Sequence, residues 1–314
     1  MSAPGRTPPR VTIRDVAEAS GVSRSTVSFV LNDTPGQTIS AVTRDRVRRA
    51  AADLGYVPHG IARALAEGVS RIVLLTIEAA QEGNYSRSFI TGLDAELAIH
   101  GHVLLVRHGG RPHGQEQQLL DVVVPRAVLS FGAAYEEGAG LDDAGGGWRD
   151  GLAAHVAMQI GYLVDQGHTE IGLAIPDKVT PRAAAHQRFA AETAQRLGVT
   201  PPAEVVLPHS RAGARDVLQA IRASQPQLTA IAAFDDACAA GILAAMADLD
   251  LRAPEDLAVI GYDEADYAAL ITPSLTTVHI DAEAHGRIVA RATLGLPHDD
   301  LELTPGRIVI RDTA

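Results

Sequence analysis

The chain has 314 residues, of which 46% are hydrophobic and 21% charged, and this composition excludes a wholly disordered protein. The formal net charge of −11 conceals an asymmetry, because residues 1–71 carry ten arginines and six acids, whereas the rest of the chain carries 17 bases and 32 acids. The length predicts two or three domains, and the charge predicts a basic head that can contact phosphate, joined to an acidic body that repels it.

The chain lacks the common sequence signals of secretion, membrane insertion and catalysis. Residues 1–10 have no apolar core of a signal peptide, and no apolar run reaches the roughly 20 residues that cross a bilayer. The single cysteine, Cys238, allows no intrachain disulfide. With Lys178 as the only lysine, no Gly-Lys-Ser/Thr phosphate loop exists, and there is no nucleophile elbow or metal-ligand spacing. We therefore expect a cytoplasmic protein that is not an enzyme and holds no metal or cofactor.

The basic head opens with two predicted short helices. The first begins after Thr12, a capping residue, and ends at Gly21, which adopts a left-handed conformation at little cost. The second covers residues 24–32 after its own cap, Ser23. Apolar residues at helical spacing give the pair an inner face: Ile13, Val16, Ala17, Val27, Val30 and Leu31. Two short helices separated by a glycine-containing turn indicate a helix-turn-helix.

A third helix is predicted over residues 43–54, where arginines recur among apolar residues. In a helix-turn-helix, the second helix enters the major groove with its N-terminal side chains first. Here those side chains are small or cationic, as groove entry requires: Ser23, Arg24, Ser25 and Ser28. The alternative for this segment is a small helical bundle whose charged face is simply solvated.

Ordered motifs over residues 11–32, 43–47, 54–58 and 62–65 make the head resemble the LacI/GalR family of bacterial transcription regulators. The resemblance implies a homodimer that represses by binding a pseudo-palindromic operator in double-stranded DNA, under the control of a small molecule. It also implies DNA contacts from a set of head and hinge residues: Thr12, Ser23, Arg24, Ser25, Thr26, Ser28, Phe29, Asn32, His59, Ala62, Arg63 and Leu65.

In this family the segment after the head is a hinge helix that folds in the minor groove, and here it would cover residues 59–67. Leu65 holds the place of the leucine that opens the central base step, where an apolar wedge costs unstacking energy but permits a bend that buries more surface. Gly60 and Gly68 weaken this helix, which agrees with folding on DNA. The alternative is that Leu65 is an ordinary linker residue.

Phe29 departs from the family pattern, which often has arginine at this place in the recognition helix. An arginine would bind guanine, whereas phenylalanine can pack only on a thymine methyl group or on sugar. The half-site should therefore differ from that of the arginine-bearing members. Phe29 could instead belong to the core, although Val27, Val30 and Leu31 already supply an inward face.

From residue 71 the pattern changes to short apolar runs separated by stretches of helical spacing. The runs are Ile72–Ile77, Val103–Val106, Ala127–Phe131, Ile171–Ile175, Val205–Leu207, Ala230–Phe234, Ala258–Tyr262 and Ile308–Ile310. Strands alternating with helices predict a parallel, doubly wound sheet, and runs that are apolar throughout predict strands buried on both faces. The fold class is thus a small all-α head plus an α/β body.

The resemblance extends into the body, most clearly over residues 163–174 and 230–278. It implies two doubly wound parallel-sheet lobes of periplasmic-binding-protein type with the effector between them. The implied domains are a DNA-binding domain over 1–58, a hinge over 59–70 and an effector-binding domain over 71–314. Within the last, the N-lobe would comprise 72–148 and 280–297, and the C-lobe 149–279 and 298–314.

The implied effector-binding residues are Tyr85, Arg182, Asp235 and Asp263. Asp263 matches an aspartate that hydrogen-bonds sugar hydroxyls, whereas Asp235 stands where the family usually has asparagine. Arg182 is one candidate for a family arginine that has no clean match, and Tyr85 lies near the first of the usual aromatics. Aromatic residues are only 4% of the chain, which leaves few stacking platforms for a sugar besides Tyr85, Trp148 and Phe234. A non-sugar effector, or none, therefore stays open.

Other polar groups have simpler interpretations. Asp236, beside Asp235, is predicted to cap a helix that starts at Ala237 instead of serving a metal or a general base. The histidines of a glycine-rich stretch are not expected to bind metal, and Cys238 is expected to pack within a helix. Two further functions are less favoured: a solute-binding protein of transport, against which the head argues, and a sugar-processing enzyme, for which no catalytic constellation exists. The absence of a C-terminal heptad repeat predicts a dimer and not a coiled-coil tetramer.

Overall fold

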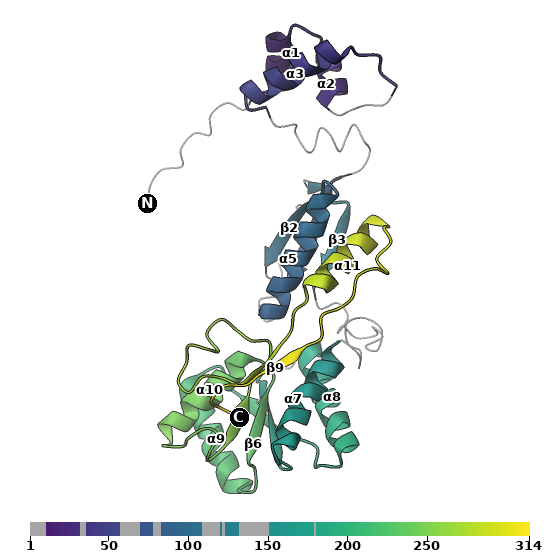
Figure 1. The fold of residues 1–314 in the computed structure, drawn as a ribbon. Coiled ribbons are helices and arrows are strands. Elements are labelled where there is room, and N and C mark those ends of the chain that lie inside the picture. The colour runs from purple at the N-terminus through teal and green to yellow at the C-terminus, as the bar shows by residue number, and fades with distance from the viewer. Residues whose placement is uncertain are drawn as a thin grey trace, which may run out of the picture. The chain divides into compact units, whose positions relative to one another are not determined.

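The computed structural model describes residues 11–31, 36–56, 70–77, 83–108, 120, 123–131, 151–178 and 180–314 (Figure 1). Contacts divide the chain into two compact units, Met1–Ile72 with His113–Arg126, and Val73–Pro112 with Ala127–Ala314. Some of the predicted site residues lie outside the described residues: Asn32, His59, Ala62, Arg63 and Leu65. Trp148 and the whole predicted hinge helix also lie outside them.

The head contains the predicted helices α1 (Ile13–Ser20), α2 (Arg24–Leu31) and α3 (Ala41–Asp53). The N-cap of α1 is Thr12, whose N–H and hydroxyl both donate to Asp15, and its C-cap is Gly21 with a φ of 67°. Helix α3 starts two residues earlier than predicted, because Ser40 accepts a hydrogen bond from the Thr43 amide and so caps it. The buried core of the head joins all three helices through Val16, Ala17, Val27, Val30, Val47 and Ala51.

The N-lobe is built on a three-stranded sheet in the order β2 (Val103–His108), β1 (Ile72–Ile77), β3 (Ala127–Ser130). Helices α5 (Asn84–Ile99) and α11 (Glu283–Leu294) pack together beside it (Figure 1). Their backbones approach so closely that a Cβ on Gly92 would lie 1.9 Å from the Glu283 carbonyl, and one on Gly286 would lie 2.1 Å from the Phe89 carbonyl. Only glycine fits at these two positions. The lobe is completed by α11, which comes from near the C-terminal end of the chain.

The C-lobe is a four-stranded parallel sheet in the order β5 (Ala203–Leu207), β4 (Ile171–Pro176), β6 (Ala230–Ala233), β7 (Ala258–Ile260). Its helices are α7 (Leu152–Asp165), α8 (Pro181–Leu197), α9 (Arg211–Ser224) and α10 (Asp236–Asp248). Strands β6 and β7 are buried along their whole length, and β4 is buried except at its last residue. The predicted doubly wound parallel architecture is confirmed here, and so is burial on both faces.

Burial on both faces is wrong for β2, β3 and the edge strand β5, in which exposed residues alternate with less exposed ones. Val103 of β2 is 62% exposed and Val128 of β3 is 47% exposed. The reason is that alternate side chains point to opposite faces of a sheet, so an apolar run does not by itself say whether both faces are covered.

A strand that was not predicted, β8 (Thr277–His279), pairs antiparallel with β9 (Arg307–Val309). The chain leads from β8 into α11 of the N-lobe, and β9 follows α11 back toward the C-lobe (Figure 1). Three residues with one central apolar side chain carry too little pattern to identify a strand from sequence. In the described part of the chain, no helix has the length and hydropathy needed to span a bilayer.

Candidate functional site

The outward face of α2 is the first candidate site, and it belongs to the head alone. Val27 and Val30 are fully buried, whereas Arg24 and Ser25 are exposed. Phe29 lies four residues after Ser25 and so on the same face of α2, and among the described residues it is not one of those that pack in the core of the head. The described part of the head therefore gives no support to the core alternative for Phe29, which is partly exposed.

Three hydroxyl groups meet at the N-terminus of α2. Ser23 Oγ lies 2.8 Å from Ser25 Oγ and 2.9 Å from Thr26 Oγ1, and it accepts a hydrogen bond from the Thr26 amide at 3.1 Å. The predicted cap of α2 is thus confirmed. Exposed Thr12 similarly begins α1. Helix N-termini with short hydroxyl side chains can donate hydrogen bonds to phosphate and to base edges.

The second candidate site is in the body, where the four predicted effector residues come together. Asp235 and Asp263 follow the C-terminal ends of β6 and β7, and Arg182 lies in the first turn of α8. Tyr85 lies in the first turn of α5, and its side chain packs against the cores of both lobes. In open α/β sheets this edge, at the carboxyl ends of the strands, is where ligands bind.

Arg182 and two aromatic rings form one wall of this site. The guanidinium carbon lies 4.6 Å from the centre of the Phe234 ring and 5.6 Å from that of Tyr262, within reach of a cation–π interaction. Both rings are almost completely buried. Phe234, a candidate stacking platform, therefore carries the arginine on its face, and the site offers a cation supported by aromatic carbon.

Asp263 lies at the centre of the site. Its Oδ1 accepts a hydrogen bond from the Tyr85 amide at 2.6 Å, so the carboxylate joins the end of β7 to the start of α5. Burial raises the pKa of Asp263 to about 7, although nearby Arg182 and the Tyr85 amide act in the opposite direction. Asp263 is therefore poised between its charged and neutral forms near neutral pH.

The prediction that Asp236 caps a helix starting at Ala237 is wrong by one residue. Helix α10 starts at Asp236, and Asp235 is the N-cap, with its Oδ1 accepting from the Cys238 amide at 2.8 Å. The sequence alone does not tell which of the two neighbouring aspartates is the N-cap, because aspartate is a good capping residue at either position. The choice depends on a tertiary contact that holds Asp236 elsewhere.

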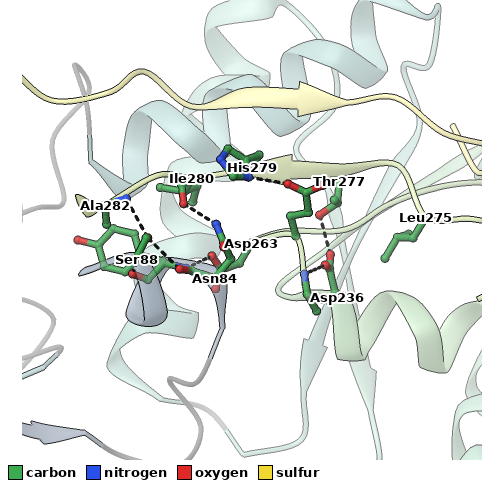
Figure 2. A network of polar contacts seen from close by, with 12 residues as sticks. Asn84, Ser88, Asp236, Asp263, Leu275, Thr277, His279, Ile280 and Ala282 are labelled. Carbon is green, nitrogen blue, oxygen red and sulfur yellow. Dashed lines mark hydrogen bonds and ion pairs between the residues drawn. The ribbon is translucent and has the colours of Figure 1, made fainter. Parts of the chain in front are cut away.

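That contact is a buried network around Asp236 (Figure 2). Its carboxylate accepts hydrogen bonds from the Tyr262 amide, the Ala265 amide and the Thr277 hydroxyl. Burial raises the pKa of Asp236 to about 6, against the influence of these three donors. Asp236 thus binds the turn after β7 to β8 and fixes the backbone that carries Asp263.

A second buried network was missed by sequence reasoning. The Gln159 amide nitrogen donates to the Ala233 and Gly261 carbonyls at 2.8 and 2.9 Å, which ties the ends of β6 and β7 together. Its oxygen lies 3.1 Å from His186 Nε2, so this nitrogen must carry the proton. Burial lowers the pKa of His186 to about 3 and keeps the ring neutral. One sequence feature could have indicated this role: His186 lies four residues after Arg182 and therefore on the same face of α8.

The segment that crosses between the lobes lies beside the same site. The Asn84 side chain donates to the Ile280 carbonyl at 2.8 Å, and the Ser88 hydroxyl accepts from the Ala282 amide at 3.0 Å (Figure 2). Further along, Glu264 pairs with His279 and with Arg311. The crossing strand is therefore bound to both lobes by side chains.

The described side chains of this site offer hydrogen bonds and charge. The site's thiol, Cys238, is buried, and burial raises its pKa. Among the described residues, no group of three or more His, Cys, Asp or Glu side chains could hold a metal ion. A helix-turn-helix head joined to a two-lobed α/β body defines a DNA-binding transcriptional regulator with a domain for a small molecule.

Comparison with known proteins assigns the head and the body to the same class of protein. Residues 12–59 match the model of bacterial regulatory proteins of the lacI family, and residues 160–313 match that of the periplasmic binding protein-like domain. The chain belongs to the LacI/GalR family of bacterial transcription regulators, whose members are not enzymes.

Two curated relatives and one solved structure illustrate the match. The chain is 26% identical over 291 residues to the transcriptional repressor CytR of Escherichia coli K12, covering 85% of this chain and 84% of CytR. It is 25% identical over 340 positions to the repressor PurR of Vibrio vulnificus, covering 96% and 98%. The lac repressor dimer bound to operator and an anti-inducer superposes with a TM-score of 0.75 at 22% identity, covering 97% and 99%.

Proposed function

We propose that this regulator is a cytoplasmic repressor that binds a pseudo-palindromic operator as a homodimer, with its DNA affinity controlled by a small molecule. The observation that carries the DNA-binding role is the outward face of α2, where Arg24, Ser25 and Phe29 are not needed by the core of the head. Two copies related by a two-fold axis would present two such helices to successive major grooves. The likeness to a repressor dimer solved on its operator supports the same role.

Binding to DNA is tested by fluorescence anisotropy with the full chain. An operator would first be selected from random double-stranded DNA and compared with the DNA upstream of the protein's own gene. We expect a two-fold symmetric motif, and binding that weakens steeply with salt because arginines displace counterions from phosphate. If no symmetric motif is enriched at low salt, the chain is not an operator-binding repressor.

Phe29 gives this proposal a specific prediction. If the ring packs on a thymine methyl group, replacing that thymine by deoxyuracil removes about 0.8 kcal/mol of apolar burial and weakens binding roughly fourfold per half-site. We expect the loss with the wild-type chain and none with Phe29→Ala. Arg24→Ala is the matched control on the same helix and should keep the distinction between thymine and uracil. A wild-type chain that is indifferent to every thymine methyl would contradict the role of Phe29.

For the small molecule, we propose that Tyr85, Arg182, Asp235 and Asp263 contact a sugar-like effector. Two observations support this proposal: Asp235 and Asp263 follow the carboxyl ends of β6 and β7, and Asp263 interacts with the Tyr85 amide and with Arg182. The second candidate is a non-sugar effector, which is favoured by Arg182 already covering the Phe234 ring on which a sugar could stack. A thermal-shift screen decides, because a ligand that binds only the folded state raises the melting temperature. Shifts from common sugars support the first candidate, and shifts confined to other compounds support the second.

A further inference from the structure

The carboxylate of one lobe sits on the first helical turn of the other. Asp263 comes from the C-lobe, and its Oδ1 accepts a hydrogen bond at 2.6 Å from Tyr85, whose amide is one of the first in α5 of the N-lobe. The first amides of a helix have no partner within the helix and carry a partial positive charge. A carboxylate at that position is therefore both a hydrogen-bond acceptor and a favourable counter-charge.

The backbone around Asp263 is shaped to present this group. Asp263 and Glu264 have φ angles of 87° and 42°, the left-handed region that favours glycine. The turn is held by the Asp263 amide donating to the Val278 carbonyl at 2.8 Å and by Asp236 accepting from the Ala265 amide. Two consecutive residues in this region cost energy that the surrounding contacts must offset.

The N-lobe is shaped to receive the group. Gly83 is the N-cap of α5, and a Cβ at this position would lie 1.8 Å from Asp263 Oδ2. Any other residue at position 83 would collide with the carboxylate. Two further contacts lie beside it: Asn84 donates to the Ile280 carbonyl, and Arg87 forms an ion pair with Asp266. The contact thus depends on specific residues on both sides.

The α5 amide and the Asp263 carboxylate meet directly. We propose that Asp263 is a latch that joins the two lobes by capping α5, and that an effector which binds Asp263 must take the place of the Tyr85 amide. The latch itself does not depend on the proposed function, but its displacement by an effector does. The effector group that displaces the Tyr85 amide has to be a hydrogen-bond donor, such as a hydroxyl or an ammonium.

The charges that face the latch agree with this chemistry. Arg182 of α8 and Arg87 of α5 are the cations that act on Asp263, and Asp236 of α10 is the nearby acid. Arg87 is already paired with Asp266, and Asp235 adds another carboxylate at the same edge. Among the described residues, Arg182 is the cation left to balance these acids against an anionic group, so the site favours a neutral or cationic donor.

The latch should respond to pH in a defined direction. Burial in the joined state raises the pKa of Asp263 to about 7, whereas a solvated aspartate has its ordinary value near 3.8. Joining the lobes therefore takes up a proton between these values, and the joined state loses stability as the pH rises from about 4 through 7. Asn at this position can still accept from the Tyr85 amide but cannot titrate.

Amide hydrogen exchange on the full chain, without DNA or effector, tests the latch. We expect Asp263→Ala to speed exchange in the peptide that covers residues 83–90 by roughly fivefold, the effect of losing one hydrogen bond. Gly83→Ala disturbs the same contact from the other side and should give the same increase. Peptides from α9 should not change, and Asp216→Ala on that exposed helix is the control.

Two results would overturn the proposal. One is unchanged exchange at the start of α5 in both Asp263→Ala and Gly83→Ala, with the folds intact by circular dichroism. The other is protection at residues 83–90, corrected for intrinsic rates, that does not fall between pH 5 and 8 in the wild type relative to Asp263→Asn. Because these measurements need neither operator nor effector, a chain that fails to bind DNA would refute the proposed function and leave the latch standing.

Discussion

The two lobes share an α/β design, but their buried polar side chains have different kinds of partner. In the C-lobe, buried Gln159 and Asp236 hydrogen-bond to backbone at the carboxyl ends of the strands, next to the candidate effector site. In the N-lobe, the buried polar residue Glu96 joins two helices, α5 and α11, through an ion pair with Arg291. The C-lobe therefore uses its buried polar groups to shape a binding edge, and the N-lobe uses them to attach a segment from the far end of the chain.

The same difference appears in the sheets. Central strands of the C-lobe are buried, whereas half of the residues in β2 and in β3 of the N-lobe are exposed. A sheet covered on both sides can hold its strand ends firmly, because the backbone groups there have no access to water and must find partners in the protein. We expect substitutions in the C-lobe networks to cost more than those in the N-lobe ion pair.

The largest expected effect is that of Asp236→Ala. The change leaves the Tyr262 amide, the Ala265 amide and the Thr277 hydroxyl without their acceptor. Unsatisfied buried donors cost about 1–3 kcal/mol each, so the free energy of unfolding should fall by roughly 3 kcal/mol or more in urea denaturation. Asp248→Ala, which removes an exposed partner of Arg211, should leave it unchanged. Equal effects of the two substitutions would show that the buried network around Asp236 stabilises the fold no more than an exposed ion pair does.

A smaller effect concerns His186 and acid. The neutral ring is buried with a pKa of about 3, whereas the unfolded chain binds a proton near pH 6.5. Stability from this group is therefore full above pH 6.5 and falls toward pH 3, by up to about 1.4 kcal/mol per pH unit. Denaturation of His186→Gln at pH 7 and 5 should show less acid sensitivity than the wild type. Exposed His209→Gln should behave like the wild type; if His186→Gln does too, the ring is not held neutral.

The smallest effect is expected from Glu96→Gln in the N-lobe. The Arg291 guanidinium and His100 lower the pKa of this buried carboxyl, so the charged form is the one that stabilises the lobe. Because Arg287 and Arg291 remain 31% and 23% exposed, solvent can replace part of the lost pairing. We expect a loss of about 1–2 kcal/mol, measured by thermal unfolding. A loss as large as that of Asp236→Ala would show that the two lobes depend equally on their buried polar groups.

Local patterns were enough to predict much of the fold. Thr12, Gly21 and Ser23 mark helix ends in the head, and the apolar runs locate all but one of the named strands, because caps and hydrophobic spacing act over a few residues. Family resemblance also named Tyr85 and Asp263, which share a hydrogen bond, and Arg182, whose charge opposes the raised pKa that burial gives Asp263. Their contacts with DNA or effector stay predictions.

Tertiary structure decided what depends on distant partners. Sequence placed the cap of α10 on Asp236 because two adjacent acids are equivalent locally, but Asp236 is drawn to Thr277 and the cap is Asp235. The contact between Asp263 and the Tyr85 amide spans 178 positions, and the room for it comes from the missing side chain of Gly83. Capping is a local property that sequence by itself determines, whereas a carboxylate that caps a helix of another lobe exists only once the chain has brought the two lobes together.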